Sequence, residues 1–399
     1  MSTGFFPAQS LLKSSTLQQD PEEAKKLQFQ KTEIISRFVQ NYIYSDGHSL
    51  LPNIQVKLYT DSAKYEGDLN NQGLKQGRGI YHYPNGDKYL GDWFNDQFNG
   101  KGVYIFAMGE RYEGDLQHGK KHGKGIYFYI NGNQYEGDWQ NDKKNGMGTY
   151  RYHTGERYEG EWKDGERHGS GKYFYIHGDK YDGMWFKGVK YGRGVLEYAS
   201  GARYDGQWSK DMMNGKGVMY YANGDRYDGE WKDNLKWGVG NYYFSDGSRY
   251  EGEWASDEKN GKGKYLNPNG DKYEGLWIQG VKNGQGVFYY ANGDKYEGEW
   301  KNDKRNGFGT LIMENGDKYV GEWNEGEKEG QGKYEFVNAD RYDGYWLKGK
   351  RHGKGTYMWG NGEAYNGEWK NDKMNGRGKF TKADGRSFEG EFKDDKKID

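Results

Sequence analysis

A Tyr-x-Gly-x-Trp motif recurs along this chain at a fixed interval, and this interval limits the possible folds more than any other feature. Each step between leading tyrosines is 23 residues, except the first, which is 24, and Phe388 begins a last, incomplete copy. A fixed period of roughly 20 to 50 residues predicts a stacked repeat architecture. The leading tyrosines are Tyr65, Tyr89, Tyr112, Tyr135, Tyr158, Tyr181, Tyr204, Tyr227, Tyr250, Tyr273, Tyr296, Tyr319, Tyr342 and Tyr365.

One copy, residues 296–318, has the pattern of a β-hairpin. Tyr296, Gly298 and Trp300 alternate with polar residues, which places them on one face of a strand. After a polar loop, the segment GFGTLIM at residues 307–313 predicts a second strand. The Asn-Gly pair that follows predicts a tight type I′ turn into the next copy, because that turn needs positive φ at both central residues. We therefore expect hairpin after hairpin along the chain.

The glycines of each copy predict how the aromatic rings pack. The glycine of Tyr-x-Gly and both glycines of Gly-x-Gly are expected to share a face with the Tyr and Trp side chains. Each glycine leaves a hollow across which a ring from a neighbouring strand can lie. Packed rings are then the main hydrophobic contribution of a sheet that has a single layer.

These motifs resemble the MORN repeat, in which Y-x-G-x-W is followed by G-x-G-x-Y. The resemblance covers residues 65–392 and implies an all-β fold: an elongated single-layer antiparallel β-meander of about 14–15 tandem 23-residue hairpins. The copies depart from the pattern at a few positions, and the sequence gives no reason for the internal Leu116. The departures are Leu69 and Leu116 for Trp, Phe388 and Phe392 for Tyr and Trp, and Ala339 for the turn Gly.

The segment before the repeats predicts one amphipathic α-helix over residues 21–43. Asp20 is a good N-cap and Pro21 suits the first helical position. Two interpretations stay open: the helix folds over the first repeat and covers the sheet edge, or it docks into a partner. Its apolar positions are Leu27, Ile34, Ile35, Phe38, Val39 and Tyr42. The predicted organisation is a disordered N-terminus (1–20), the helix (21–43), a degenerate capping half-repeat (44–64), the repeats (65–392) and a charged tail (393–399).

Composition excludes several classes of protein. Aromatic residues make up 17% of the chain, which argues against disorder even though only 33% of the residues are apolar. The formal net charge of -1 gives no basic excess for nucleic acid, and without Cys there are no disulfides or thiolate metal sites. The acidic residues and His recur without a pocket or a ligand cluster. We therefore expect a non-enzyme with no cofactor and no metal.

Two sets of residues are candidates for binding. The first set consists of apolar and aromatic residues at positions near the loops where most copies carry a polar residue. Exposed aromatic residues at such positions predict a protein interface. The second consists of basic loop residues that could hold a phosphoinositide head group. The candidate partner-binding residues are Phe94, Phe186, Tyr191, Trp237, Ile278 and Leu347 in the repeats, with Phe38 and Tyr42 in the predicted helix. The candidate lipid-binding residues are Lys120, Lys121, Lys124, Lys348, Lys350, Arg351 and Lys354.

The functional expectation is a structural scaffold that joins other proteins in a large cytoskeletal assembly. The family resemblance favours the ciliary axoneme, because radial-spoke-head MORN proteins are similar in having tandem repeats with little else. Homodimerisation is a further expectation. The alternative is a peripheral adaptor that binds phosphoinositides and tethers a membrane to the cytoskeleton.

Overall fold

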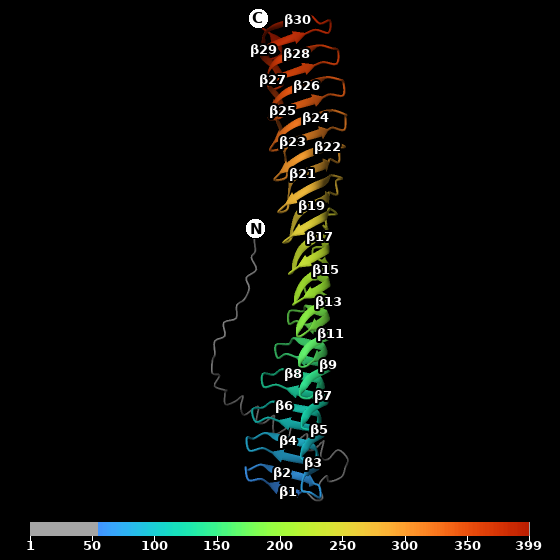
Figure 1. Ribbon diagram of the computed structural model, residues 1–399, viewed down its shortest axis with the longest axis vertical. Coiled ribbons are helices and arrows are strands. Elements are labelled where there is room, and N and C mark those ends of the chain that lie inside the picture. The colour runs from blue at the N-terminus through green and yellow to red at the C-terminus, as the bar shows by residue number, and fades with distance from the viewer. Residues whose placement is uncertain (1–54, 399) are drawn as a thin grey trace. The chain divides into compact units, whose positions relative to one another are not determined.

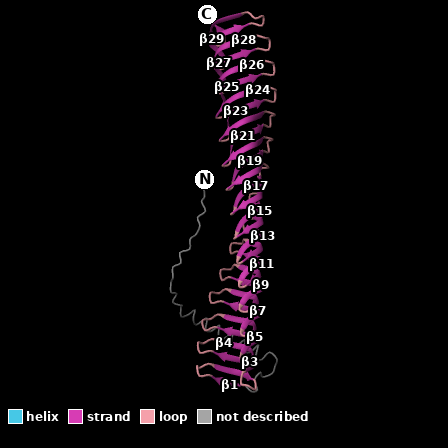
Figure 2. Cartoon of the chain, in the orientation of Figure 1, coloured by secondary structure: helices cyan, strands magenta, loops and turns pink. Residues whose placement is uncertain are grey.

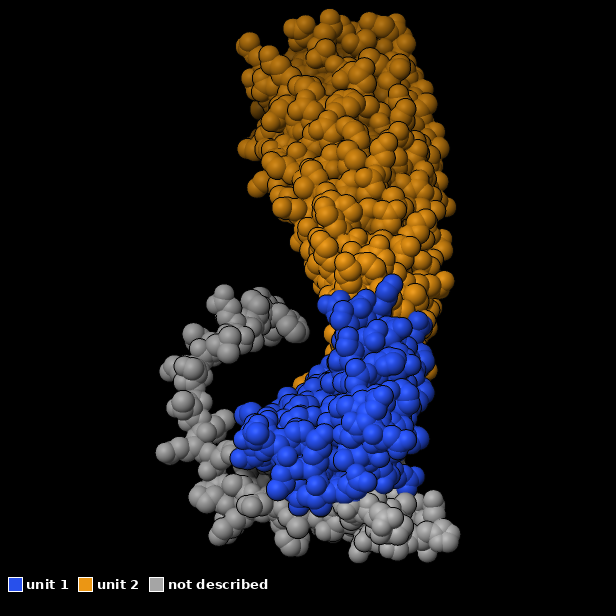
Figure 3. Space-filling model, turned by 60° about the horizontal axis from the view of Figure 1, so that its bottom comes forward, with its two compact units in different colours: residues 1–166 blue, residues 167–399 orange. Residues whose placement is uncertain are grey.

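The computed structural model describes residues 55–398, and they divide between residues 166 and 167 into two units, coloured blue and orange in Figure 3. The secondary structure of the described residues is entirely strand, turn and loop, as Figure 2 shows. The predicted helix over residues 21–43 and the predicted disordered segment before it lie outside the described residues.

Unit 1 is a β-meander in which each strand pairs antiparallel with the next along the chain (Figure 1). Its strands are β1 (Gln55–Leu58), β2 (Lys64–Leu69), β3 (Lys75–His82), β4 (Lys88–Phe94), β5 (Gln97–Ile105), β6 (Arg111–Gln117), β7 (Lys120–Phe128), β8 (Gln134–Gln140), β9 (Lys143–Arg151) and β10 (Arg157–Lys163).

Unit 2 repeats the same antiparallel pairing. Its strands are β11 (Glu166–Phe174), β12 (Lys180–Phe186), β13 (Val189–Glu197), β14 (Arg203–Ser209), β15 (Met212–Tyr220), β16 (Arg226–Lys232), β17 (Leu235–Tyr243), β18 (Arg249–Ala255), β19 (Glu258–Leu266), β20 (Lys272–Ile278), β21 (Val281–Tyr289), β22 (Lys295–Lys301), β23 (Lys304–Ile312), β24 (Lys318–Asn324), β25 (Glu327–Glu335), β26 (Arg341–Leu347), β27 (Lys350–Met358), β28 (Ala364–Lys370), β29 (Lys373–Thr381), β30 (Ser387–Lys393) and β31 (Lys396–Lys397).

The core of each copy is the face that carries the motif aromatics, which we call the aromatic face. The Tyr296 ring meets Trp300 of its own copy edge-on at 5.2 Å and Trp323 of the next copy at 5.3 Å. The Tyr296 hydroxyl donates to the carbonyl of Glu299, and the indole N–H of Trp300 donates to the carbonyl of Gly286. These contacts explain why Tyr and Trp recur: each ring is buried between two others, and its polar atom still has a partner.

The glycine prediction is right for two of the three glycines and wrong for the third. A Cβ on Gly298 or Gly309 would collide with the Tyr296 ring or its hydroxyl, so both glycines share the face of that ring as expected. The ring comes from the neighbouring strand for Gly309, as predicted, but from the same strand for Gly298. The missing Cβ of Gly307 points instead toward the carboxylate of Glu299, on the opposite face of the sheet, and its φ is 63°. The cause is the register shift between Gly298 and Trp300, a bulge that turns Gly307 away from the aromatics.

The turn prediction assigned the type I′ geometry to the wrong connection. The turn in which both central residues have positive φ is the two-residue turn within the hairpin, formed by Asn302 and Asp303. In the Asn-Gly connection, Gly316 alone has positive φ, and its N–H donates to the carbonyl of Met313. Asn315 instead accepts from the backbone N–H of Asp317 at 3.0 Å, which favours a type I turn followed by a left-handed glycine.

Candidate interaction site

The face opposite the aromatics, called the opposite face below, carries the exposed residues that the sequence singled out. In most copies the fourth slot of Y-x-G-x-W is acidic, and its carboxylate caps the bulge. Asp92, for example, accepts from the backbone N–H of Lys101 at 2.9 Å. Cross-strand ion pairs continue this polar row, such as Lys124 with Asp138 at 2.6 Å. Apolar residues on this face therefore stand out against a charged background.

Two of the predicted partner-binding residues come together in unit 2. The rings of Phe186 and Tyr191 lie 5.8 Å apart, and the His168 ring lies 5.3 Å from Phe186. Phe186 is 46% exposed and Tyr191 is 51% exposed. The sequence reasoning missed Met184, which is also exposed and lies on the same face two residues before Phe186. The signal was available, because Met184 fills the slot that is acidic in most copies. We call Met184, Phe186 and Tyr191 the Phe186 patch.

A second patch forms around Trp237 on β17. Leu235, Trp237 and Val239 alternate along this strand on the opposite face, and all three are exposed. The ammonium group of Lys232 lies 4.6 Å from the Trp237 ring centroid. The sequence analysis named Trp237 alone. The alternation of Leu, Trp and Val in LKWGV already indicated that all three side chains lie on one face of the strand. We call these three residues the Trp237 patch. Its strand lies four strands from β13, or roughly 19 Å along the sheet.

The other predicted partner-binding residues are dispersed. Phe94 on β4 and Ile278 on β20 are exposed, whereas Leu347 on β26 is half-buried. Leu276 lies two residues before Ile278, and Tyr345 lies two residues before Leu347. Both are exposed, as Met184 is before Phe186. Phe38 and Tyr42 lie outside the described residues. A binding role for all of these positions stays a prediction.

The seven basic candidates divide into three groups. Lys121 and Arg351 point into the aromatic face, where Lys121 lies 5.2 Å from the Trp139 ring and Arg351 4.6 Å from the Trp369 ring. Lys124 is in the ion pair with Asp138 described above. The exposed remainder is Lys120, Lys348, Lys350 and Lys354.

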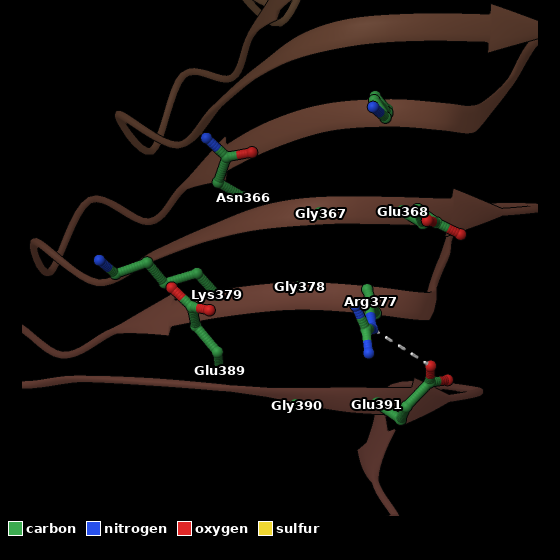
Figure 4. A pocket seen from close by; sticks show the side chains of 10 residues that line it. Asn366, Gly367, Glu368, Arg377, Gly378, Lys379, Glu389, Gly390 and Glu391 are labelled. Carbon is green, nitrogen blue, oxygen red and sulfur yellow. Dashed lines mark ion pairs between the residues drawn. The ribbon is translucent and has the colours of Figure 1, made fainter.

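Lys354 borders a polar hollow of ≈ 740 Å³ on the opposite face of unit 2 (Figure 4). Its walls carry both charge signs, and Arg377 forms an ion pair with Glu391 at 3.9 Å. Because acidic side chains share this hollow, it does not offer a purely cationic surface to a phosphate group.

A periodic cation on the aromatic face was missed altogether. The residue two places before the first glycine of Gly-x-Gly is Lys or Arg in every copy except those with Phe98, Met213 and Met374. Lys144 is typical: its ammonium group lies 4.2 Å from the Trp162 ring, 4.7 Å from Tyr150 and 5.5 Å from Tyr135. We call this position the cation slot. Its recurrence in the sequence was visible, but its target, a Trp in the following copy, was not.

Burial on the aromatic face shifts the pKa values of the side chains that meet there. It raises the pKa of the leading tyrosines, such as Tyr296, above the ordinary value of 10.0. Desolvation lowers the pKa of the cation-slot lysines Lys190, Lys236, Lys259 and Lys282, and it lowers that of Lys328 to about 8. Each of these groups has packed partners, and burial among them is the main cause of the shift in its pKa.

In the part of the chain that the structure covers, no helix is long and apolar enough to cross a membrane. Within residues 55–398, no three His, Cys, Asp or Glu side chains come together as metal ligands.

The fold and its surfaces define a tandem β-hairpin repeat protein with one aromatic and one largely polar face. The MORN repeat model matches residues 65–88, 89–111 and twelve further consecutive segments through residue 385. The chain therefore belongs to the MORN-repeat family, and the resemblance seen in the sequence is confirmed. Such repeats form a scaffold for protein or lipid interactions.

No curated protein sequence matches the chain significantly. Among solved structures, the TCP10 domain of Danio rerio CPAP in complex with a STIL peptide has 13% sequence identity and a TM-score of 0.20, and covers 61% of this chain and 93% of its own. The dCPAP TCP domain of Drosophila melanogaster, in complex with a proline-rich motif of Ana2, has 14% identity and a TM-score of 0.20, and covers 55% and 88%. At these TM-scores, neither likeness supports an inference about this chain.

Proposed function

We propose that this chain is a non-enzymatic scaffold that mediates protein–protein interactions in a large cytoskeletal assembly, with the ciliary axoneme as the assembly and a radial-spoke-like role within it. One observation supports the protein-binding part most directly. The Phe186 patch and the Trp237 patch each group several exposed apolar and aromatic side chains on a face where most copies carry charged or polar residues in the same slots. Exposed aromatic residues of this kind are enriched at the centres of protein interfaces.

The chemistry of the copies also favours a scaffold over an enzyme. The groups with shifted pKa values recur in every part of the repeat array and are engaged in packing, as for Tyr296 and Lys328. The pKa of Asp317, in one of the turns, is lowered because its carboxylate accepts from the backbone N–H of Val337 and from the hydroxyl of Tyr334. The axonemal assignment rests on the family analogy alone.

The first experiment locates a tagged full-length protein in its own cell before and after non-ionic detergent. Retention on demembranated axonemes is the expected result. Release with the detergent fraction would overturn the axonemal assignment.

The protein-binding part has a separate test. Tyr191→Ala combined with Trp237→Ala is expected to remove at least one cross-linked neighbour of the tagged protein. The matched control is Asn260→Ala with Asn306→Ala, which alters the same slot at the same two-copy spacing. If both double variants keep every neighbour, the two patches are not the partner surface.

A phosphoinositide-binding adaptor is the second candidate, favoured by the exposed lysines Lys120, Lys348 and Lys350. Electrostatic attachment to a membrane weakens as salt rises, whereas an apolar protein interface resists salt. Sedimentation with phosphoinositide liposomes at low and high ionic strength separates the two candidates. A failure to sediment at low salt would exclude the adaptor.

A further inference from the structure

A small apolar cluster lies on the opposite face of unit 1, where a single-layer sheet would be open to water. Ile80 on β3 pairs with Leu90 on β4, Leu90 pairs with Val103 on β5, and Ile105 follows Val103 on the same face. We call these four residues the Leu90 patch. Leu90 is 3% exposed and Val103 is 1% exposed, and Ile105 is buried as well, so these three are buried like the aromatic core, whereas Ile80 is half-buried.

The repeat provides internal controls that show this burial to be unusual. Ile105 is 8% exposed, whereas Ile312, the same residue in the same slot of a later copy, is 41% exposed. The flanking side chains do not explain the difference, because each isoleucine lies between two long basic residues. Ile105 pairs with Lys88 and Arg111, and Ile312 pairs with Lys295 and Lys318.

The same comparison holds for other side chains of this region. Val195 and Val218, in the slot of Val103, are half-buried, and Val320 in the slot of Leu90 is half-buried as well. The side chain of Arg111 is 17% exposed, while that of Arg157 in the same slot is 36% exposed. Since strands β2 to β9 pair only with their neighbours in the chain, the described strands of unit 1 supply no second layer over the patch.

We propose that residues 21–43 of this same chain cover the Leu90 patch with the apolar side of their predicted helix. The apolar positions Leu27, Ile34 and Phe38 recur at a roughly helical spacing and give that segment one apolar stripe. A helix is about 10–12 Å wide. Strands β3 to β5 span about 10 Å across the sheet, so one helix laid along β4 matches the width of the patch.

The connection between the two elements is long enough. Residues 44–54 separate the predicted helix from β1, and they can span at most about 40 Å when extended. Strand β1 lies four strands from β5, which is about 19 Å. The segment therefore shields a face of the sheet, not its free edge at β1, and this distinguishes the proposal from simple edge capping.

The absence of Cys from the sequence makes the test direct, because one introduced thiol reports on one position. The full-length variants Ile105→Cys and Ile312→Cys are labelled with N-ethylmaleimide, and the modified fraction is followed by mass spectrometry. Covering predicts that the thiol at position 105 reacts at least about tenfold more slowly than the thiol at position 312. Equal rates in the two variants would overturn the proposal.

A second pair of variants identifies the cover. Adding Ile34→Asp and Phe38→Asp places two charges on the proposed contact side of the segment. The rate at position 105 should then rise to that at position 312, and the rate at position 312 should not change. If the thiol at position 105 stays protected despite both substitutions, something other than residues 21–43 covers the patch and the proposal is wrong. Protection that falls on dilution would then point to a second copy of the chain, and protection that does not would point to another element of the same chain. Val103→Cys, compared with Val218→Cys, repeats the test should Ile105→Cys lose its fold.

Discussion

The ammonium nitrogen of Lys328 lies 4.8 Å from the centroid of the Trp346 ring, although the two residues belong to neighbouring copies of the repeat. The same nitrogen lies 4.5 Å from the Tyr334 ring and 5.2 Å from the Tyr319 ring. One cation thus joins three rings from two copies. Because successive copies are linked in this way, stability depends on contacts between neighbours more than on any single hairpin.

Replacing Lys328 by Met is expected to change how stability varies with pH. Burial lowers the pKa of Lys328 to about 8, while an unfolded lysine titrates near 10.4. Between these pH values the unfolded chain binds one more proton, so the free energy of unfolding rises with pH in that window. Met occupies the same slot at Met213 and Met374 and therefore fits.

Denaturant unfolding at several pH values between 7 and 10 tests this prediction. In the unaltered protein the free energy of unfolding should rise with pH in this window. In the Lys328→Met variant that slope should be smaller by up to about 1.4 kcal/mol per pH unit. Identical slopes for the two proteins would contradict the prediction. The control is Lys301→Met, at an exposed position, which should leave the slope unchanged.

Phe98 and Leu116 are expected to be energetically coupled. Phe98 fills a cation slot, with its ring 4.0 Å from Tyr89 and 5.0 Å from Trp93, and Leu116 fills the position of the Trp that a cation there would meet. The larger ring at one position thus accompanies the smaller side chain at the other. We infer that this pairing underlies the departure at Leu116, for which the sequence alone gives no reason.

A double-mutant cycle measures the coupling. Leu116→Trp alone should destabilise the chain by about 1–3 kcal/mol, because the indole would be overpacked against Phe98. Combining it with Phe98→Lys should recover at least about 0.5 kcal/mol relative to the sum of the single changes. Additive effects would show that the two substitutions are independent.

Ala339→Gly should stabilise the chain by about 1 kcal/mol. Ala339 replaces the turn glycine and has a φ of 69°, a left-handed conformation that costs a residue with a Cβ about 1–2 kcal/mol. Its N–H donates to the carbonyl of Phe336, as the turn glycines do in other copies, so Gly can take its place without losing a contact. Ala291→Gly, in a turn residue without positive φ, is the control and should be neutral or slightly destabilising. The denaturation midpoints of the two variants decide the matter.

Gly309→Ala should destabilise the chain far more than Gly326→Ala. A Cβ at Gly309 would collide with the Tyr296 ring, which is fixed between two tryptophans, whereas a Cβ at Gly326 would meet open space. We expect a loss of about 3 kcal/mol at Gly309. At Gly326, where φ is 95°, backbone strain alone costs about 1 kcal/mol. Similar losses at both sites would mean that the Tyr296 ring moves to make room.

Much of the fold followed from the sequence because its signals are local. The period of 23, the alternation of Tyr296, Gly298 and Trp300, and the loop residues fixed the repeat, the strands and the face that carries the aromatics. The register shift after Gly298 and the choice of Asn302–Asp303 for the type I′ turn were not predicted. Both depend on how two strands align, and residue types alone specify this alignment weakly.

The candidate surfaces, too, were predicted in part from the sequence and in part revealed only by the structure. The sequence by itself determined that Phe186, Tyr191 and Trp237 break the polar pattern of their slots. Only the tertiary structure decided that Phe186 and Tyr191 touch, that Lys121 and Arg351 turn toward the aromatic rings, and that Ile105 is buried where Ile312 is exposed. The physical reason is that a motif records what each copy shares, whereas burial and ring contacts depend on the strands, and the neighbouring copies, that pack around each side chain.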